Sequence, residues 1–150
     1  MEMECDAREL SEADVYRAFA VIQHVMPGFD LEAWKTLTAT PALRYNWLTV
    51  TDPQGYIRGL CHVFLSQHPA LGRQLEVPIF ASVSLIDEQG VVKRLFELAE
   101  RRARQEACDS MHFWPAGSLD WNNVLNLRQS GSWSQGLVYR LPAERGPVIH

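Results

Sequence analysis

With 150 residues, of which 47% are hydrophobic, the chain is long enough to enclose one hydrophobic core and too short for two typical domains. Its formal charge of -4 argues against nucleic-acid binding, because such proteins need a basic surface to displace counterions from phosphates. We therefore expect one domain without a nucleic-acid partner, whose charge is compatible with a cationic amine.

The cysteines and the hydropathy of the chain bear on its compartment. Cys5, Cys61 and Cys108 are odd in number and far apart, so neither a disulfide framework nor a C-x-x-C motif can be drawn from them. No window approaches the roughly 18 apolar residues of a membrane span, and the acidic N-terminus lacks the pattern of a signal peptide. We expect a cytoplasmic protein with no membrane contact.

The first segment of the chain predicts a strand followed by a helix. A short strand is expected within residues 2–10, and Ser11 with Asp14 forms a variant of the capping box that opens the helix. The helix is expected to end before Pro27 and Gly28. Its apolar residues recur at three- and four-residue spacing and are Val15, Ala18, Phe19, Ile22, Val25 and Met26.

A short helix and a β-hairpin are predicted next. Asp30 is expected to cap a helix over Leu31–Leu37. From Tyr45 on, aromatic and β-branched residues favour a strand, and the Asp-Pro-Gln-Gly sequence at 52–55 is typical of a turn. A second strand over residues 57–65 completes the hairpin.

A third long strand is predicted over residues 74–86. Its apolar positions alternate along one face without a break, at Leu75, Val77, Ile79, Ala81, Val83 and Leu85. Pro78 lies inside this strand. Because proline cannot donate a hydrogen bond to a ladder, we expect a bulge or an interrupted pairing near it.

The clearest helix of the sequence is predicted over residues 90–107. Its core stripe consists of Val92, Leu95, Phe96, Ala99, Ala103 and Ala107. A strand over residues 109–114 follows, and a crossover helix of this length normally places its two flanking strands parallel. A last helix over residues 120–129 and a final strand over residues 137–141 complete the pattern.

The order of these elements resembles that of the GNAT superfamily of acyl-CoA-dependent N-acyltransferases. The best local match is LFELAERRARQEACDSMHF, residues 95–113, which is similar to the third helix and fifth strand of that family. The resemblance implies an α/β (α+β) fold with a mixed central sheet and helices on both faces. It also implies one domain over residues 1–141, followed by a C-terminal tail at 142–150.

In the GNAT family, a turn at the start of the third helix binds the CoA pyrophosphate. Free backbone N–H groups and the helix dipole suit an anion there. The resemblance places this turn at residues 87–92. It implies that acetyl-CoA or another acyl-CoA is bound by Gly90, Val91, Val92 and Lys93.

Two residues of this turn depart from the pattern of the family. Val92 replaces a small residue, and Asp87 stands where a cationic or neutral polar residue is usual. A carboxylate about 7 Å from a pyrophosphate charge would cost about 2 kcal/mol, or roughly thirtyfold in affinity. The alternative, that Asp87 serves only as a helix cap, therefore stays open.

Amine acylation needs a base, a polarised thioester carbonyl and an acid for the thiolate. The resemblance implies that Glu76, fourteen positions before Gly90, is the base. The alternative for Glu76 is an ordinary strand residue that faces solvent.

The resemblance also implies where the carbonyl and the acid lie. The carbonyl would be bound by backbone N–H groups near Val83 to Leu85, where the strand should separate from its neighbour. Leu127 occupies the position of the usual acid, a tyrosine, so Tyr139 or a water is the substitute.

The predicted function is that of a GNAT-like N-acyltransferase, which moves an acyl group, most simply acetyl, from acyl-CoA to a small-molecule or peptide amine. The alternative is a non-catalytic GNAT-like module for binding or dimerisation, such as a homodimer. Its paired apolar patch would involve Trp114, Trp121 or Trp133. A third option takes the acyl group from an acidic carrier protein, which would meet Lys93, Arg94, Arg101 and Arg102.

The remaining histidines and tryptophans predict no separate chemistry. The five His residues have no H-x-x-x-H or H-E-x-x-H spacing, so we expect no metal site. His62 and His112 are interpreted as hydrogen-bonded sheet residues. Trp34 and Trp47 are interpreted as packing residues, with the wall of an acceptor cleft as the alternative.

Overall fold

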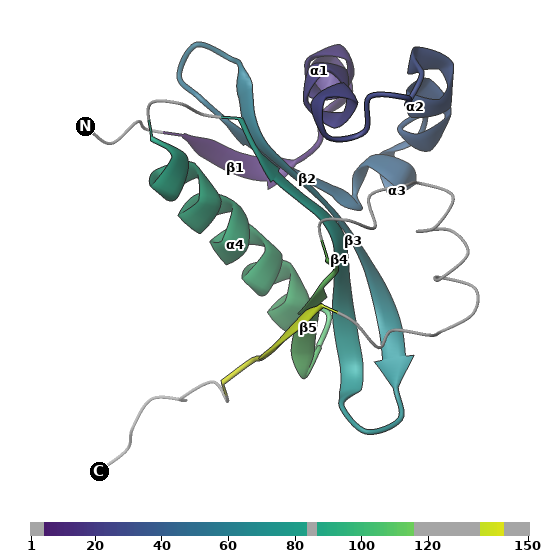
Figure 1. The fold of residues 1–150 in the computed structure, drawn as a ribbon, viewed down its shortest axis with the longest axis vertical. Helices are drawn as coiled ribbons and strands as arrows, with labels where there is room; N and C mark the ends of the chain where they lie inside the picture. The colour runs from purple at the N-terminus through teal and green to yellow at the C-terminus, as the bar shows by residue number, and fades with distance from the viewer. Residues whose placement is uncertain (1–4, 84–86, 116–135, 143–150) are drawn as a thin grey trace.

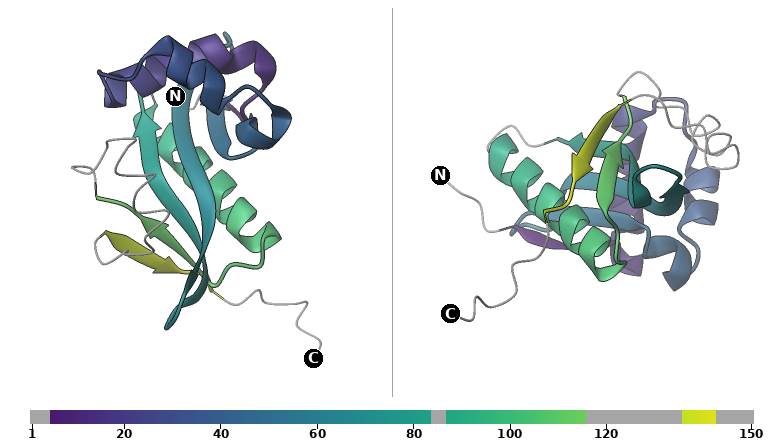
Figure 2. Two further views of the ribbon diagram at one scale, coloured as in Figure 1. Left: turned by 90° about the vertical axis from the view of Figure 1, so that its right-hand side faces the viewer. Right: turned by 90° about the horizontal axis from the view of Figure 1, so that it is seen from below.

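The protein is built around one six-stranded sheet with helices on both faces. The computed structural model describes residues 5–83, 87–115 and 136–142. The strands follow chain order, β1-β2-β3-β4-β5-β6, and every neighbouring pair is antiparallel except β4 and β5, which are parallel. Helix α4 covers one face, and α1 and α2 cover the other (Figures 1 and 2). The predicted mixed sheet and the predicted parallel pair are both confirmed.

The elements agree with most of the predicted ones. The strands are β1 (Asp6–Glu9), β2 (Trp47–Thr51), β3 (Ile57–His68), β4 (Gly72–Ser82), β5 (Ser110–Phe113) and β6 (Leu137–Arg140). The helices are the 3-10 turn η1 (Glu12–Asp14), α1 (Val15–Val25), α2 (Leu31–Leu37), α3 (Pro41–Arg44) and α4 (Glu88–Gln105). The predicted helix over 120–129 and all but the first residue of the expected tail lie outside the described residues.

Local hydrogen bonds explain where two of these helices begin. The Asp30 carboxylate accepts from the Ala33 N–H at 2.7 Å, which confirms the predicted cap of α2. The short helix α3 was not predicted. It begins because the Thr40 hydroxyl accepts from the Leu43 N–H at 3.2 Å and Pro41 occupies the first helical position.

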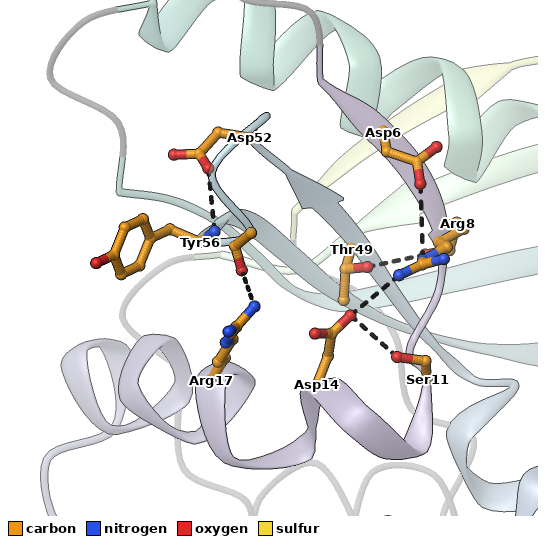
Figure 3. A network of polar contacts seen from close by, with 9 residues as sticks. Asp6, Arg8, Ser11, Asp14, Arg17, Thr49, Asp52 and Tyr56 are labelled. Carbon is orange, nitrogen blue, oxygen red and sulfur yellow. Dashed lines mark hydrogen bonds and ion pairs between the residues drawn. The ribbon is translucent and has the colours of Figure 1, made fainter.

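The predicted capping box at the start of α1 is wrong. Ser11 Oγ donates to Asp14 Oδ2 at 3.0 Å and caps no helical N–H. Arg8 on β1 also donates to Asp14 Oδ2, at 3.3 Å. Figure 3 shows how these contacts join β1 to Asp14, the last residue of η1 before α1, while Arg17 on α1 donates to the Gly55 carbonyl in the β2–β3 turn at 2.7 Å. The bonds that orient α1 on the sheet are therefore side-chain bonds between elements.

Two hydrophobic cores lie on opposite faces of the sheet. The core under α1 and α2 contains Trp34 and Trp47, which are 0% and 1% exposed and have ring centroids 4.7 Å apart. Trp34 Nε1 donates to the Val15 carbonyl at 2.7 Å. Both tryptophans are thus packing residues. The core under α4 is built from Val91, Leu95, Leu98, Ala99 and Ala103 of the helix and from apolar residues of β2 to β5.

Two residues of α4 differ from prediction. Val92, expected in the core stripe, is 36% exposed, and Val91 takes its place in the core. Arg102, expected on a basic surface, is 3% exposed; its guanidinium lies 3.5 Å from the Tyr45 ring centroid and donates to Glu9 at 3.2 Å. The basic surface proposed for a carrier protein therefore lacks Arg102.

A bulge in β4 confirms the interruption expected near Pro78. His62 pairs with Ile79, but Phe64 pairs with Glu76, so β4 has one residue more than β3 in this interval. The unbroken alternation predicted for β4 is wrong for the same reason. Residues Leu75 and Val77 pack in the core under α4, whereas Ile79 and Ala81 pack in the core under α1.

Candidate active site

The parallel strands β4 and β5 separate after a short paired stretch. They pair over residues 74–77, and the Trp114 N–H then donates to the Val77 carbonyl at 3.1 Å. Strand β4 continues to Ser82, and no pairing with β5 beyond Val77 is found among the described residues. This separation opens a gap between the two strands, bordered by the first turns of α4.

A cavity of about 610 Å³ lies at this separation, on the α4 face. Three aromatic rings line it: Phe113 lies 5.7 Å from Phe80 and 5.8 Å from Phe96, centroid to centroid. The remaining lining residues are Leu137 on β6 and Glu88, Gln89, Val92 and Lys93 at the start of α4. The surface of the cavity is almost entirely apolar, although Glu88 and Lys93 border it at the start of α4, so it suits an apolar arm of a ligand.

Glu76 lies on the α1 face of β4, next to the bulge, and is 0% exposed. The interpretation of Glu76 as a solvent-facing residue is therefore wrong, although the predicted face is right. The parallel register places Glu76 opposite His112, and the His112 Nδ1 lies 2.8 Å from Glu76 Oε1. Trp114 Nε1 donates to Oε1 at 3.3 Å, and Ser66 Oγ donates to Oε2 at 3.2 Å. These hydrogen bonds compensate for the hydration that the Glu76 carboxyl group loses by being buried.

Tyr139, the candidate acid, lies on the other face of the sheet. It pairs with Met111 on β5, and its ring packs edge-on against Phe96 of α4 at 5.3 Å. Glu76 and His112 face α1 instead. The structure thus does not bring Tyr139 together with Glu76.

The Val83 N–H, expected at the thioester carbonyl, does not face the separation between β4 and β5. The Val83 N–H donates to the Arg58 carbonyl of β3 at 2.8 Å, so it is used within the sheet, and Leu85 lies outside the described residues. Since amides alternate in direction along an antiparallel strand, those of Phe80 and Ser82 point away from β3, toward the separation from β5.

The carboxylate of Asp87 lies at the N-terminus of α4, where a bound phosphate was expected. Asp87 Oδ1 accepts from the Gly90 N–H at 3.2 Å, and the Asp87 carbonyl accepts from the Val91 N–H at 3.0 Å. A methyl group on Gly90 would collide with this carboxylate. In helical geometry, Glu88 and Gln89 contribute the other first-turn amides. Of the four residues expected at the pyrophosphate, Val92 and Lys93 line the cavity, while the amides of Gly90 and Val91 bond to Asp87.

A second cavity, of about 680 Å³, lies on the α1 face at the far end of β4. Arg17 and His24 of α1, Arg58 of β3 and Val83 contribute to its lining. The first residue of β4 that lines this cavity is Ser82, which lies beyond the bulge. It is therefore distinct from the Glu76 cluster.

The cysteines and metal-binding residue types give no further site in the described part of the chain. Cys5, Cys61 and Cys108 are unbridged and buried, and desolvation raises the pKa of the Cys61 thiol, which disfavours the nucleophilic thiolate. Residues 5–83, 87–115 and 136–142 contain no group of three His, Cys, Asp or Glu arranged to hold a metal ion. No helix in these ranges is long and apolar enough to cross a membrane.

Sequence reasoning identified Glu76 but missed its pairing with His112. Each is a polar residue between two apolar neighbours, and the two strands had been predicted to be parallel. A polar residue on each of two parallel strands was the feature from which the pairing could have been predicted. The register that makes them partners is a long-range property, which no local pattern specifies.

No family model matches the chain, and no curated protein matches its sequence. Solved structures do match its fold. The aminoglycoside N-acetyltransferase AAC(6')-Iy in complex with CoA has a TM-score of 0.62 at 11% identity, covering 99% of this chain and 98% of that one. The NatC complex bound to Gag peptide and CoA has a TM-score of 0.59 at 15% identity, with 86% and 84% covered.

A third structure extends this comparison to another acceptor. Arylalkylamine N-acetyltransferase 2 from Aedes aegypti has a TM-score of 0.55 at 12% identity, with 83% of this chain and 82% of that chain covered. Together these matches show that the protein has the fold of the GNAT superfamily, as the resemblance implied.

Proposed function

We propose that the protein is a GNAT-fold N-acyltransferase, which moves an acyl group, most simply acetyl, from acyl-CoA to an amine. One observation carries the proposal: a buried Glu76–His112 pair, 2.8 Å apart, lies where β5 leaves β4. The 610 Å³ cavity opens at the same separation. A proton-accepting pair beside a gap for a thioester is the arrangement that amine acylation requires.

The lining of the cavity fits the two ends of an acyl-CoA. Its aromatic walls suit the apolar part of the pantetheine arm, and Phe80 and Ser82 turn backbone N–H groups toward that arm. Lys93 and the backbone amides of Glu88 and Gln89 are the groups proposed to meet the phosphates. The Asp87 carboxylate opposes the phosphates, so we expect weaker binding of CoA than an uncharged turn would give.

The acceptor is proposed to be a small-molecule or peptide amine. The compared structures include a peptide complex, an aminoglycoside acetyltransferase and an arylalkylamine acetyltransferase, all with this fold. A net charge of -4 favours the approach of a cation. An amine acceptor is cationic before it is deprotonated.

Calorimetric titration with CoA and acetyl-CoA, followed by an assay of CoA release with a panel of amines, tests the proposal. The panel contains peptides, an aminoglycoside and an arylalkylamine. Phe80→Glu places a charge in the cavity and is expected to abolish CoA binding. Leu65→Glu, on the exposed end of β3, is the matched control and should bind normally. Absence of heat at millimolar CoA with the wild-type protein would contradict the proposal.

The Asp87 cap favours a second candidate, a non-catalytic GNAT-fold module that binds a partner or dimerises without CoA. Asp87→Asn separates the two, because Asn keeps the helix cap but removes the charge. If the turn binds CoA phosphates, this variant should bind CoA about ten- to thirtyfold more tightly than wild type. If neither protein binds CoA, the second candidate is favoured. Of the patch predicted for it, Trp114 is 9% exposed, and Trp121 and Trp133 lie outside the described residues.

A further inference from the structure

The 680 Å³ cavity on the α1 face has no role in the reaction proposed above, and its described lining is basic. Arg17 and His24 of α1 and Arg58 of β3 line it, and Glu88 at the start of α4 is the carboxylate of the described lining. Tyr56 also lines it and is 58% exposed. Two guanidinium groups beside an exposed aromatic ring suit a ligand that combines a phosphate with a planar base.

Hydrogen bonds hold both arginines in place without using all of their donors. Arg17 Nη1 donates to the Gly55 carbonyl at 2.7 Å, as Figure 3 shows, and Arg58 Nε donates to Asp52 Oδ2 at 2.8 Å. The other guanidinium nitrogens of these two residues form no hydrogen bond within the described part of the chain. Arg58 is ion-paired with Asp52, whereas Arg17 has no carboxylate partner among the described residues. Arg17 thus has both a free charge and free donors for an anionic ligand.

The 680 Å³ cavity adjoins the 610 Å³ cavity proposed for acyl-CoA. Glu88 belongs to the described lining of both. Strand β4 also leads from one to the other, because Phe80 lines the 610 Å³ cavity, and Ser82 and Val83 line the 680 Å³ cavity. A ligand as long as CoA can therefore extend past the end of β4 from one cavity into the other.

On the basis of the proposed function, we infer that the 680 Å³ cavity binds the 3′-phosphorylated adenosine end of CoA. Arg17 and Arg58 bind the 3′-phosphate through their remaining N–H groups, which suit phosphate geometry. The adenine ring stacks on Tyr56. Arg58 Cζ lies 5.3 Å from the Tyr56 ring centroid, so the groups for the phosphate and for the base are neighbours.

This position supplies positive charge that the start of α4 lacks. Asp87 caps this helix and Glu88 lies in its first turn, so an anion there meets two carboxylates. CoA carries a phosphomonoester on its ribose in addition to the pyrophosphate. With the phosphomonoester beside Arg17 and Arg58, CoA gains two cationic partners besides Lys93, which offset the two carboxylates.

The test compares CoA with 3′-dephospho-CoA, which lacks only the phosphomonoester, by calorimetric titration of the full chain. Wild type should bind CoA about ten- to thirtyfold more tightly than dephospho-CoA. Arg17→Gln should reduce this ratio by about threefold or more and leave the Kd for dephospho-CoA within twofold of wild type. The matched control is Arg101→Gln, which makes the same change of charge at an exposed position of α4 outside both described linings and should keep the wild-type ratio.

Tyr56→Ala separates the base from the phosphate. Both ligands carry adenine, so loss of the ring should weaken both by the same factor, about fivefold or more, and leave their ratio unchanged. If both Kd values in Tyr56→Ala equal those of wild type, the adenine position is wrong.

Adenosine 3′,5′-bisphosphate reports on the nucleotide end alone. It lacks the arm that enters the 610 Å³ cavity, so it should bind Phe80→Glu and wild type with the same Kd, and Arg17→Gln more weakly. Loss of its binding in Phe80→Glu would overturn the inference. Equal binding of CoA and dephospho-CoA by wild type, or equal weakening of both by Arg17→Gln, would also overturn it and leave the proposed function standing. If wild type binds neither CoA nor dephospho-CoA, the proposed function itself fails.

Discussion

Asp52 shows how one buried residue can organise a turn. Its side chain is 3% exposed, and it accepts hydrogen bonds from the backbone of Gln54 and Tyr56 and from Arg58 Nε at 2.8 Å. Desolvation works to raise the pKa of Asp52, but the Arg58 contact and the two backbone N–H groups outweigh it, so the net pKa is lowered. The ionised form is therefore the one that the fold stabilises.

This shift predicts a pH dependence of stability. Because the pKa of Asp52 is lower in the folded protein, its contribution is present above the ordinary value of 3.8 and is lost as the pH falls below it. Asp52→Asn is expected to cost about 1.5–3 kcal/mol at pH 7, measured by urea unfolding, and the difference from wild type should shrink toward pH 3. Asp6→Asn, at an exposed pair with Arg8, is the control and should change little. An equal effect of Asp52→Asn at both pH values would contradict this account.

Prediction at the scale of single residues succeeded where the signal was local. Asp30 and Pro78 have their predicted effects, because a cap and a missing N–H act within a few residues. The predicted exposure of Arg102 was wrong, because the Tyr45 ring that covers its guanidinium is distant in sequence. The neighbours of Glu76 could not be predicted for the same reason.

At the scale of elements, α4 lies unusually close to the sheet at Gly59 of β3. A Cβ added to Gly59 would meet Val91 Cγ1 at 3.1 Å and Leu95 Cδ2 at 3.4 Å. The close approach seats the first turn of α4, and hence the rim of the 610 Å³ cavity. Gly59 therefore sets the distance between the helix and the strands.

Gly59→Ala is expected to destabilise the protein by about 1–3 kcal/mol through overpacking, measured by thermal or urea unfolding. Gly28→Ala is the matched control, because nothing lies within 4 Å of the added methyl group. The control should leave stability unchanged or slightly raised. Equal changes in stability in the two variants would show that the close approach of α4 to Gly59 is not what makes the substitution destabilising.

Element boundaries were predictable where composition changes sharply, as at Asp30 and at the turn before Ile57. They were less predictable in β4, because the alternation of apolar residues continues past Pro78 although the faces exchange there. A two-residue period cannot reveal an inserted residue when both faces of the strand are buried.

At the scale of the whole molecule, two cores share one sheet. Ile22 lies in the core under α1 and Leu95 in the core under α4, and both are 0% exposed. Since β2, β3 and β4 contribute to both cores, loss of either should unfold the sheet. We expect one cooperative transition.

Ile22→Ala and Leu95→Ala should each lower the free energy of unfolding by about 2–5 kcal/mol within a single transition. Fluorescence follows the five tryptophans, of which Trp34 and Trp47 lie in the core under α1, and circular dichroism reports on the helices and strands as a whole. The transitions by the two methods should coincide in both variants. A transition seen by only one method would indicate that the cores unfold separately.

The bulge in β4 also determines the sides from which two substrates would arrive. Because the strand exchanges its faces there, Phe80 belongs to the α4 side while Glu76 belongs to the α1 side. The acyl arm of a donor, seated against Phe80, and an acceptor beside His112 would then occupy opposite surfaces of the sheet and meet only through the gap between the strands. The donor and the acceptor could therefore be bound at the same time. Initial-rate plots should accordingly intersect, as a ternary complex requires, and parallel lines would indicate a substituted-enzyme route.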